Sequence, residues 1–341
     1  MSSRDSLILK ELERSEVSIA ELLEKEEFKI SKITLNRDLA ALVKQGFVET
    51  IGQGKATKYK LTSRYKLLKE VDFAHYFSVH YDDRKVQESF NFEVFSILKD
   101  IFTKAEQEKL EELNLQYQKN ITDTTDTIYR KELERLIIDL SWKSARLEGN
   151  TYDLLDTERL FKDKIEASGH SKQEALMLLN HKYALDFILE NKSGFQELSL
   201  EKIIEIHKLL VKDLDVSAGL RSKKVGIIGT KYKPLAKQED IEKALVLMCE
   251  LVNLTSFPLA KALIVLACIS YIQAFEDGNK RSARIIATAI LLAFDYCPIS
   301  YRKVDDYDYK KSILLFYEQN NLYYLKKLLS SQFKFAVQEY F

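Results

Sequence analysis

Residues 273–284 read Gln-Ala-Phe-Glu-Asp-Gly-Asn-Lys-Arg-Ser-Ala-Arg, and they join two runs, 259–271 and 282–294, that are apolar nearly all round. Helices of that kind lie in the middle of a helical bundle, so a charged turn between them needs a functional reason. The start of a helix presents free N–H groups and the positive end of its dipole to an anion. The stretch therefore predicts a phosphate-binding loop inside a mainly α-helical domain.

The residue types in this loop suit a nucleotide with its metal ion. Gly278 lets the backbone approach a ligand closely, because it has no side chain. Arg281 and Arg284 share one helix face, so both can hold phosphates through forked hydrogen bonds. Asp277 offers the oxygen ligand that Mg²⁺ prefers. The alternative, an ordinary capped turn with solvated charges, leaves the coincidence of these residue types unexplained.

The composition bounds the class of protein. The chain has 341 residues with 3 prolines and 10 glycines, which allows two or three domains but too few turns for an all-β fold. Lys+Arg and Asp+Glu balance at 52 each, so the net charge indicates no partner. The three cysteines lie in apolar surroundings without metal-binding spacing, and the sequence shows neither a signal region nor a membrane span. We expect a soluble cytoplasmic protein with no membrane partner.

Residues 1–62 show the pattern of a winged helix-turn-helix domain. The last of three helical runs ends at Gly46, a residue type that suits the end of a helix. Two short alternating runs around a glycine-containing turn then predict a β-hairpin. The stretch Thr-Leu-Asn-Arg-Asp-Leu at 34–39 resembles winged helices of the DeoR-type bacterial regulators. The expected helices and strands cover residues 5–15, 18–27, 31–45, 47–51 and 57–61.

Charge favours DNA as the partner of this domain. Residues 1–27 carry 4 basic and 8 acidic side chains, whereas residues 28–61 carry 7 basic and 2 acidic ones. The basic set falls on the third helix and the hairpin, where a winged helix meets phosphates. A domain used only for docking on another protein is the alternative. The candidate DNA-binding residues are Lys32, Thr34, Asn36, Arg37, Lys55 and Lys58.

The remaining chain divides into a connector and a long helical domain. Aromatic residues recur without a helical period in residues 63–104, which predicts a poorly regular connector that packs on the next domain. Long helical patterns return afterwards, so the last domain is expected over 105–341. Within it, a helix over about 126–150 would precede a core over about 175–330.

The loop at 273–284 resembles the signature of the Fic (Fido) family, His-x-Phe-x-(Asp/Glu)-Gly-Asn-x-Arg-x-x-Arg. The resemblance covers roughly residues 130–330 and implies a Fic-type helical bundle that binds ATP with Mg²⁺. Members of the family usually transfer AMP to a Ser, Thr or Tyr hydroxyl of a protein. A protein target or self-modification is therefore implied, and a homodimer is left open.

The resemblance also implies a role for each matching residue of the loop. Phe275 would be the buried anchor, and Asp277 would be the magnesium ligand. The nucleotide-binding set continues with Gly278 and Asn279 at the α-phosphate region, Arg281 and Arg284 at the outer phosphates, and Lys280, which stands where glycine is commoner.

A second stretch resembles the family's flap. Residues 219–234 alternate like a short β-hairpin, and the flap pairs with a target segment through main-chain hydrogen bonds. By that resemblance, Val225, Ile227 and Gly229 would contact the target. A plain surface hairpin is the alternative.

A third stretch, Ser144-Ala-Arg-Leu-Glu148-Gly149-Asn150, closes a long predicted helix. It resembles the family's inhibitory motif, (Ser/Thr)-x-x-x-Glu-(Gly/Asn). Glu148 would pair with Arg284 and take the place of the γ-phosphate, because a carboxylate and a phosphate compete for one guanidinium group. A surface glutamate before a glycine helix end is the alternative.

Gln273 stands where the family carries its catalytic histidine. Histidine can take the proton of the attacking hydroxyl because its pKa lies near neutrality, and a glutamine amide cannot. Losing a general base typically costs about 10²–10⁴-fold in rate, so we expect a weakened or inactive enzyme. Two hypotheses follow. One is a protein adenylyltransferase of low activity that Glu148 auto-inhibits; the other is a DNA-binding transcriptional regulator that uses a degenerate Fic domain as its nucleotide sensor.

Overall fold

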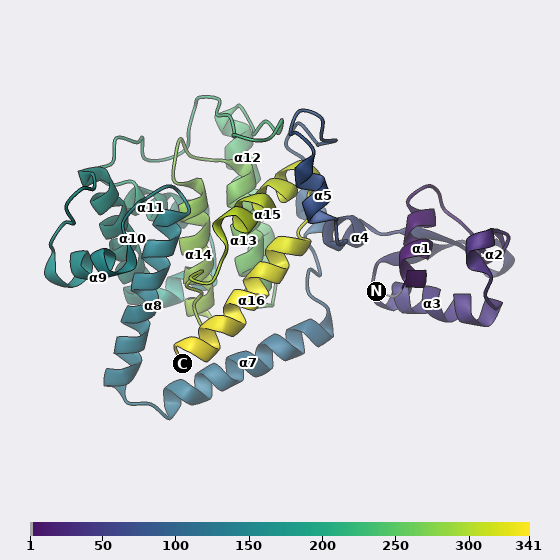
Figure 1. Ribbon diagram of the computed structural model, residues 1–341, viewed down its shortest axis with the longest axis horizontal. Coiled ribbons are helices and arrows are strands. Elements are labelled where there is room, and N and C mark those ends of the chain that lie inside the picture. The colour runs from purple at the N-terminus through teal and green to yellow at the C-terminus, as the bar shows by residue number, and fades with distance from the viewer. Residues whose placement is uncertain (1–2) are drawn as a thin grey trace. The chain divides into compact units, whose positions relative to one another are not determined.

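The computed structural model describes residues 3–341, apart from the side chain of Lys55. The chain divides into two compact units, of which the first comprises the chain up to Glu70 together with Ser96–Thr103. The second comprises Val71–Phe95 and Lys104–Phe341. Helices dominate both units (Figure 1), and the described part contains one sheet, an antiparallel pair of strands. The mainly α-helical fold class is confirmed.

The first unit consists of short helices and one β-hairpin. Its elements are α1 (Ser3–Leu12), α2 (Ile19–Leu23), the 3-10 turn η1 (Glu26–Phe28), α3 (Lys32–Lys44), β1 (Val48–Ile51), η2 (Gly54–Ala56), β2 (Lys58–Leu61) and α4 (Ser63–Leu68). In the hairpin, Val48 lies opposite Leu61. Gly46 follows the last turn of α3 with φ 72°, a left-handed conformation that glycine adopts without steric cost. The helices and strands occur in the order that the sequence predicts.

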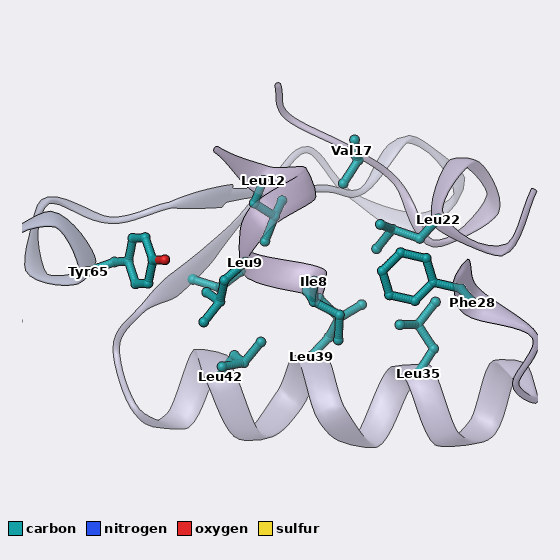
Figure 2. Close-up of a cluster of buried hydrophobic side chains, with 11 residues drawn as sticks. Ile8, Leu9, Leu12, Val17, Leu22, Phe28, Leu35, Leu39, Leu42 and Tyr65 are labelled. Atoms are coloured by element: carbon teal, nitrogen blue, oxygen red, sulfur yellow. The ribbon is translucent and has the colours of Figure 1, made fainter. Parts of the chain in front are cut away.

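Apolar side chains from α1, α2 and α3 form the core of this unit (Figure 2). Leu35, Leu39 and Leu42 line one face of α3 and are fully buried. Their spacing of four and three residues is that of a helix with one apolar face. Ile8 and Leu9 of α1 lie opposite them. The other face of α3 is consequently left to the solvent.

The second unit is a bundle of long helices around α13 and α14, which run through its middle in Figure 1. The short α6 (Val94–Ile97) crosses the border between the two units. The elements of the second unit are α5 (Phe73–Ser78), α7 (Lys104–Thr122), α8 (Asp126–Arg146), α9 (Leu154–Asp163), α10 (Lys172–Glu190), η3 (Lys192–Gln196), α11 (Leu200–Leu210), α12 (Gln238–Leu254), α13 (Pro258–Ile272), α14 (Asn279–Ala293), α15 (Asp306–Gln319) and α16 (Tyr323–Glu339).

The two central helices are buried along their whole lengths. Every residue of α13 is buried, and in α14 all residues except Lys280 are buried. α8, α10 and α11 pack on α14, while α12, α15 and α16 pack on α13. The turn between the central helices is therefore fixed by the core at both of its ends.

The flap stretch 225–234 corrects one expectation, because it forms no hairpin in the described structure. Gly229 has a left-handed φ of 82°, and Pro234 has no N–H to donate, so both interrupt a regular ladder. The N–H of Lys233 instead donates to the carbonyl of Glu88 at 2.7 Å, beside an isolated parallel bridge. The alternating sequence is thus paired with the connector and not with itself.

A buried ion pair links this connector to the flap at Gly229. Arg84 Nη1 donates to both carboxylate oxygens of Glu318, at 3.1 and 3.0 Å. Its Nη2 donates to the carbonyl of Gly229 at 3.1 Å, and Tyr76 Oη donates to the same carboxylate at 2.6 Å. Because both charged side chains are shielded from water, removing either one would leave an unpaired buried charge.

The remaining sequence expectations on class concern membranes and cysteines. No helix in residues 3–341 is both long and apolar enough to span a lipid bilayer. Cys249, Cys268 and Cys297 are free and buried. Burial raises the pKa of the Cys249 thiol to about 12, so it stays protonated and packs as a small apolar residue.

The core of the first unit gives a stability prediction. Leu39→Ala removes a fully buried side chain from the centre of that core, so it should lower the free energy of unfolding by about 2–5 kcal/mol. Val43→Ala, on the same helix at 38% exposure, should change it by less than about 0.5 kcal/mol. Urea unfolding followed by circular dichroism measures both. Equal effects of the two substitutions would contradict the described packing.

Candidate functional site

The loop between α13 and α14 is closed by its own asparagine. The backbone N–H of Phe275 donates to Asn279 Oδ1 at 2.9 Å, and Asn279 Nδ2 donates to the carbonyl of Phe275 at 2.8 Å. Gly278 caps α14 with φ 80°, which directs the first N–H groups of the helix out of the turn. The sequence predicted α14 from residue 282. It begins at Asn279, so the charged residues that follow belong to its first turn.

A stacked pair of rings supports the loop from α11. The rings of His207 and Phe275 lie 3.7 Å apart and are tilted by only 5°. The N–H of Gly219 donates to His207 Nδ1 at 3.3 Å, and Nε2 lies 3.0 Å from the carbonyl of Asp277. A carbonyl only accepts, so Nε2 carries the proton and Nδ1 does not. Burial lowers the pKa of His207 to about 4, and the ring is therefore neutral.

Arg281 carries unused hydrogen-bonding capacity at this loop. Its side chain is 1% exposed, and Nη2 donates to Asp277 Oδ2 at 2.7 Å. Within the part of the chain that the structure describes, its buried Nε and Nη1 have no hydrogen-bond partner. Burial is also the main reason that the pKa of this guanidinium is lowered. Buried donors without partners are costly, so the residue suits an anion placed beside the start of α14.

Arg284, one turn further along α14, is fully buried, and each of its three side-chain nitrogens donates a hydrogen bond. Its Nε donates to Ser144 Oγ at 2.9 Å, and Nη1 donates to Tyr309 Oη at 3.2 Å. Its Nη2 donates to the carbonyl of Ser144 at 2.8 Å and to Glu148 Oε1 at 2.9 Å. The structure thus brings together the predicted Ser144, Glu148 and Arg284.

Glu148 binds two cations through its two oxygens. Oε1 accepts from Arg284, and Oε2 accepts from Lys280 Nζ at 2.7 Å. Burial alone would raise the pKa of this carboxyl, but the two cations outweigh burial and hold it at about 2. Glu148 was expected on the helix itself. It lies in the turn after α8, which ends at Arg146, and Gly149 continues that turn with φ 101°.

A histidine orients Ser144 in this network. His181 Nδ1 lies 2.7 Å from the carbonyl of Met177, so it carries the proton. Its Nε2, 2.9 Å from Ser144 Oγ, therefore accepts the hydroxyl proton, which leaves that oxygen free to accept from Arg284. Burial lowers the pKa of His181 to about 3, so this order of protons holds at neutral pH.

The side chain of Gln273 is turned into the bundle. Its backbone is left-handed, with φ 51°. Its Nε2 donates to the carbonyl of Ser270 at 2.6 Å and to Tyr317 Oη at 3.2 Å. The amide therefore contributes hydrogen bonds to the end of α13, and it provides no proton acceptor for a substrate.

Arg221 ties the flap to this loop, and sequence analysis gave it no role. Its Nε donates to the carbonyl of Gln273 at 2.5 Å, Nη1 to that of Lys223 at 2.7 Å, and Nη2 to that of Leu235 at 2.6 Å. Its own N–H donates to the carbonyl of Ala274 at 3.0 Å. One buried guanidinium thus fixes both ends of the flap to the first residues of the loop. An arginine between two glycine-containing runs was the only signal for it in the sequence.

The flap itself is open to the solvent at its tip. Val225, Ile227 and Gly229 are half-buried, while Ile228 between them is 97% exposed.

The candidate DNA-binding residues lie in the first unit, apart from this loop in sequence. Lys32, Asn36 and Arg37 are exposed on α3, and Lys58 is exposed at the start of β2. Thr34 is half-buried, and its N–H and hydroxyl are hydrogen-bonded to the hydroxyl of Ser31, which is the N-cap of α3. The side chain of Lys55 lies outside the described part of the chain.

A comparison with known families agrees with this geometry. The sequence model of the Fic/DOC family matches residues 197–291, which include α11, the flap and the loop. The chain contains a Fic domain. The family description fits the sequence resemblance at the loop, although the matched range is shorter than the resemblance suggested.

Relatives of the Fic domain occur among curated proteins and solved structures. "Protein adenylyltransferase Fic" of Nematostella vectensis is 29% identical over 176 residues, which are 49% of this chain and 40% of that protein. Fic-1 from C. elegans has a similar fold, with a TM-score of 0.58, 18% identity and 70% of each chain covered. A Fic domain containing signaling protein from Bacteroides thetaiotaomicron has a TM-score of 0.58 and 18% identity over 67% of this chain and 94% of its own. The chain spans about two fifths of the length of the curated relative.

The two-cation contact of Glu148 predicts a pH-dependent stability. The pKa of Glu148 falls from 4.5 to about 2 on folding, so its charged form stabilises the Fic domain above about pH 4.5. That contribution is lost as the pH falls toward 2. Glu148→Gln should therefore lower the free energy of unfolding by up to about 3 kcal/mol at neutral pH. The difference from the parent should shrink below about pH 4.5 in urea unfolding series.

Glu158→Gln is the matched control, because Glu158 pairs with Lys162 at 2.7 Å on the surface of α9. Its effect should stay below about 0.5 kcal/mol at every pH. A loss in Glu148→Gln that does not vary with pH would show that the carboxylate charge is not what stabilises the turn.

Proposed function

We propose that the Fic domain binds ATP with Mg²⁺ and belongs to the class that transfers AMP to a Ser, Thr or Tyr hydroxyl of a protein. The observation that carries the proposal is Arg281 in the first turn of α14, whose buried Nε and Nη1 have no hydrogen-bond partner among the described residues. A phosphate chain supplies the anionic acceptors that these donors lack. The relatives named as protein adenylyltransferases point to ATP as its source.

Different loop residues would bind the phosphates and shape the loop. Arg281, Arg284 and Lys280 would contact phosphates, with the backbone of Gly278 and Asn279 at the helix start. Asn279 and Phe275 shape the loop, because the side-chain amide of Asn279 is already bonded to the Phe275 backbone. These residues suit a chain of phosphates better than a single anion, since the cations follow one another along α14.

Asp277 is the loop carboxylate that would hold Mg²⁺. The Asp277 side chain is 62% exposed. Once a phosphate takes its place on the Arg281 guanidinium, its carboxylate is free to bind a metal ion. The described residues contain no group of three or more metal-binding side chains, so phosphate oxygens and water would complete the coordination. When bound, Mg²⁺ would neutralise phosphate charge.

In the proposed reaction, the target's hydroxyl oxygen attacks the α-phosphorus, a new O–P bond forms, and the bond to the β-phosphate oxygen breaks. Pyrophosphate leaves, and the hydroxyl proton must go to a base. Gln273 cannot take it, and its amide is already bonded to Ser270 and Tyr317. Solvent must therefore accept the proton, which fits a rate about 10²–10⁴-fold below that of a site with a base.

Glu148 would also inhibit the reaction. Its carboxylate accepts from Arg284 Nη2, whereas Nε and Nη1 of Arg284 donate to Ser144 Oγ and Tyr309. A γ-phosphate would compete for the same donor, so ATP would bind in an unproductive position while Glu148 stays in place. The flap residues Val225, Ile227 and Gly229 would receive the extended target segment, because the neighbouring Ile228 at the tip of the flap is exposed.

Transfer of α-³²P-labelled AMP to the protein itself and to an added cell extract tests this proposal. The parent, Glu148→Gly, Gln273→His and the double variant are compared. We expect little labelling in the first three and a gain of at least about 10²-fold in the double variant, because it restores the base and removes the inhibitor.

Two outcomes of that experiment would contradict the proposal. Labelling by the parent that Gln273→Ala leaves unchanged would show that this position does not limit catalysis. Failure of ATP with Mg²⁺ to raise the melting temperature of any of the four forms would remove the nucleotide site itself, since ligand binding to the native state raises it.

We infer a second function, DNA binding, for the first unit. Its α3 exposes Lys32, Asn36 and Arg37 on the face opposite its apolar core, together with Ile33 at 82% exposure. The basic residues suit phosphates, and an exposed apolar side chain among them suits a thymine methyl group in the major groove. The Fic domain would then act as a nucleotide sensor for a transcriptional regulator.

Gel-shift titration with the DNA that flanks the protein's own coding region tests this second function. Affinity should fall steeply with salt, and Arg37→Ala should weaken binding and reduce the salt slope by about 1. Lys10→Ala, at an exposed position of α1, is the matched control and should leave both unchanged. Binding without salt dependence, or none at all, would favour a unit that docks on another protein.

A further inference from the structure

Lys280, which would contact phosphate in the proposed nucleotide site, is bonded to Glu148 in the structure. It is 31% exposed, in a helix whose other residues are buried. It also lies in the first turn together with Arg281, and that turn contains no acidic residue. Positive side chains at the start of a helix oppose its dipole, so this arrangement is favourable only with an anion nearby.

In the structure, that anion is Glu148. Its Oε2 accepts from Lys280 at 2.7 Å, and its Oε1 accepts from Arg284 at 2.9 Å. Each oxygen of one carboxylate therefore has its own cation. The carboxylate is 17% exposed, so a larger part of the attraction survives screening by water than at a surface pair.

The two cations differ in how firmly they are held. Arg284 is fixed by Ser144 and Tyr309 whether or not Glu148 is present. Lys280 Nζ has Glu148 as its one recorded partner among the described residues, and it ends a flexible four-carbon chain. If a phosphate displaces the carboxylate from Arg284, the ammonium group loses its partner and can follow the incoming anion.

We propose that Lys280 is a shared cation that holds Glu148 in the inhibited form and holds the terminal phosphate of a nucleoside triphosphate when Glu148 is displaced. This rests on the proposed nucleotide site and adds how that site selects its ligand. Lys280 then favours a triphosphate over a diphosphate only when Glu148 is out of the way. Because it stabilises both competing states, its removal has a small net effect on ATP affinity in the parent.

A double-mutant cycle separates the two contacts. The parent, Lys280→Met, Glu148→Gly and the double variant are titrated with ATP–Mg²⁺ and with ADP–Mg²⁺ by calorimetry. In the Glu148→Gly background, Lys280→Met should weaken ATP binding about 10-fold and leave ADP binding unchanged, since one charge-assisted hydrogen bond to the third phosphate is lost. In the parent background, the effect on ATP should be less than about 3-fold.

Melting temperatures without nucleotide test the Glu148 contact by itself. Lys280→Met should lower the melting temperature of the parent and should not lower that of Glu148→Gly. Lys162→Met removes a Lys–Glu pair of the same 2.7 Å length from the surface of α9 and serves as the control in both backgrounds.

The outcomes distinguish this inference from the proposed function. Equal effects of Lys280→Met on ATP affinity in both backgrounds, or parallel losses for ATP and ADP, would overturn the shared-cation role while leaving nucleotide binding intact. No ATP binding by any of the four variants would overturn the nucleotide site. Equal melting shifts with and without Glu148 would overturn the inhibited-state contact.

Discussion

The architecture of the Fic domain depends on one buried charge, the guanidinium of Arg284. Burying a charge costs several kcal/mol of desolvation, so hydrogen-bond acceptors must be placed to offset that cost. The matching groups come from the end of α8, the turn after it and α15, through Ser144, Glu148 and Tyr309. Two segments far apart in sequence, residues 144–148 and α15, must therefore meet α14 at one place. Their convergence places the loop at the centre of a rigid frame.

The same arrangement leaves positive charge at the start of α14. Lys280, Arg281 and Arg284 face two carboxylates, those of Asp277 and Glu148. Asp277 is mostly exposed, so it compensates its partner only weakly. The loop therefore combines a buried ion pair, Arg284–Glu148, with a partly exposed one, Arg281–Asp277. This difference marks where a ligand would enter and which contact it would have to break.

The sequence was a good guide wherever the signal was local. Helical periodicity located α13 and α3, and the residue types of 273–284 identified the loop. The resemblance to the family's inhibitory motif identified the glutamate that meets it. The start of α14 was misplaced because charged residues in a first helical turn look like a loop. Arg221, Tyr309 and the Arg84–Glu318 pair were missed, since each gains its meaning from a partner more than 20 residues away or from backbone carbonyls. The prediction of a hairpin in the flap was wrong. An alternating sequence cannot show that flap carbonyls accept from Arg84 and Arg221, or that a flap N–H donates to the connector.

The backbone conformation of Gln273 bears on which side chains position 273 can carry. Its left-handed conformation is uncommon for glutamine, and histidine is among the residues that adopt it more readily. Arg221 and the Phe275–Asn279 clamp fix that conformation through main-chain groups, without using the side chain at 273. The shape of the loop and the presence of a proton acceptor at position 273 are therefore independent of each other. A substitution at this one position can add or remove a proton acceptor while the main-chain bonds of the loop stay in place.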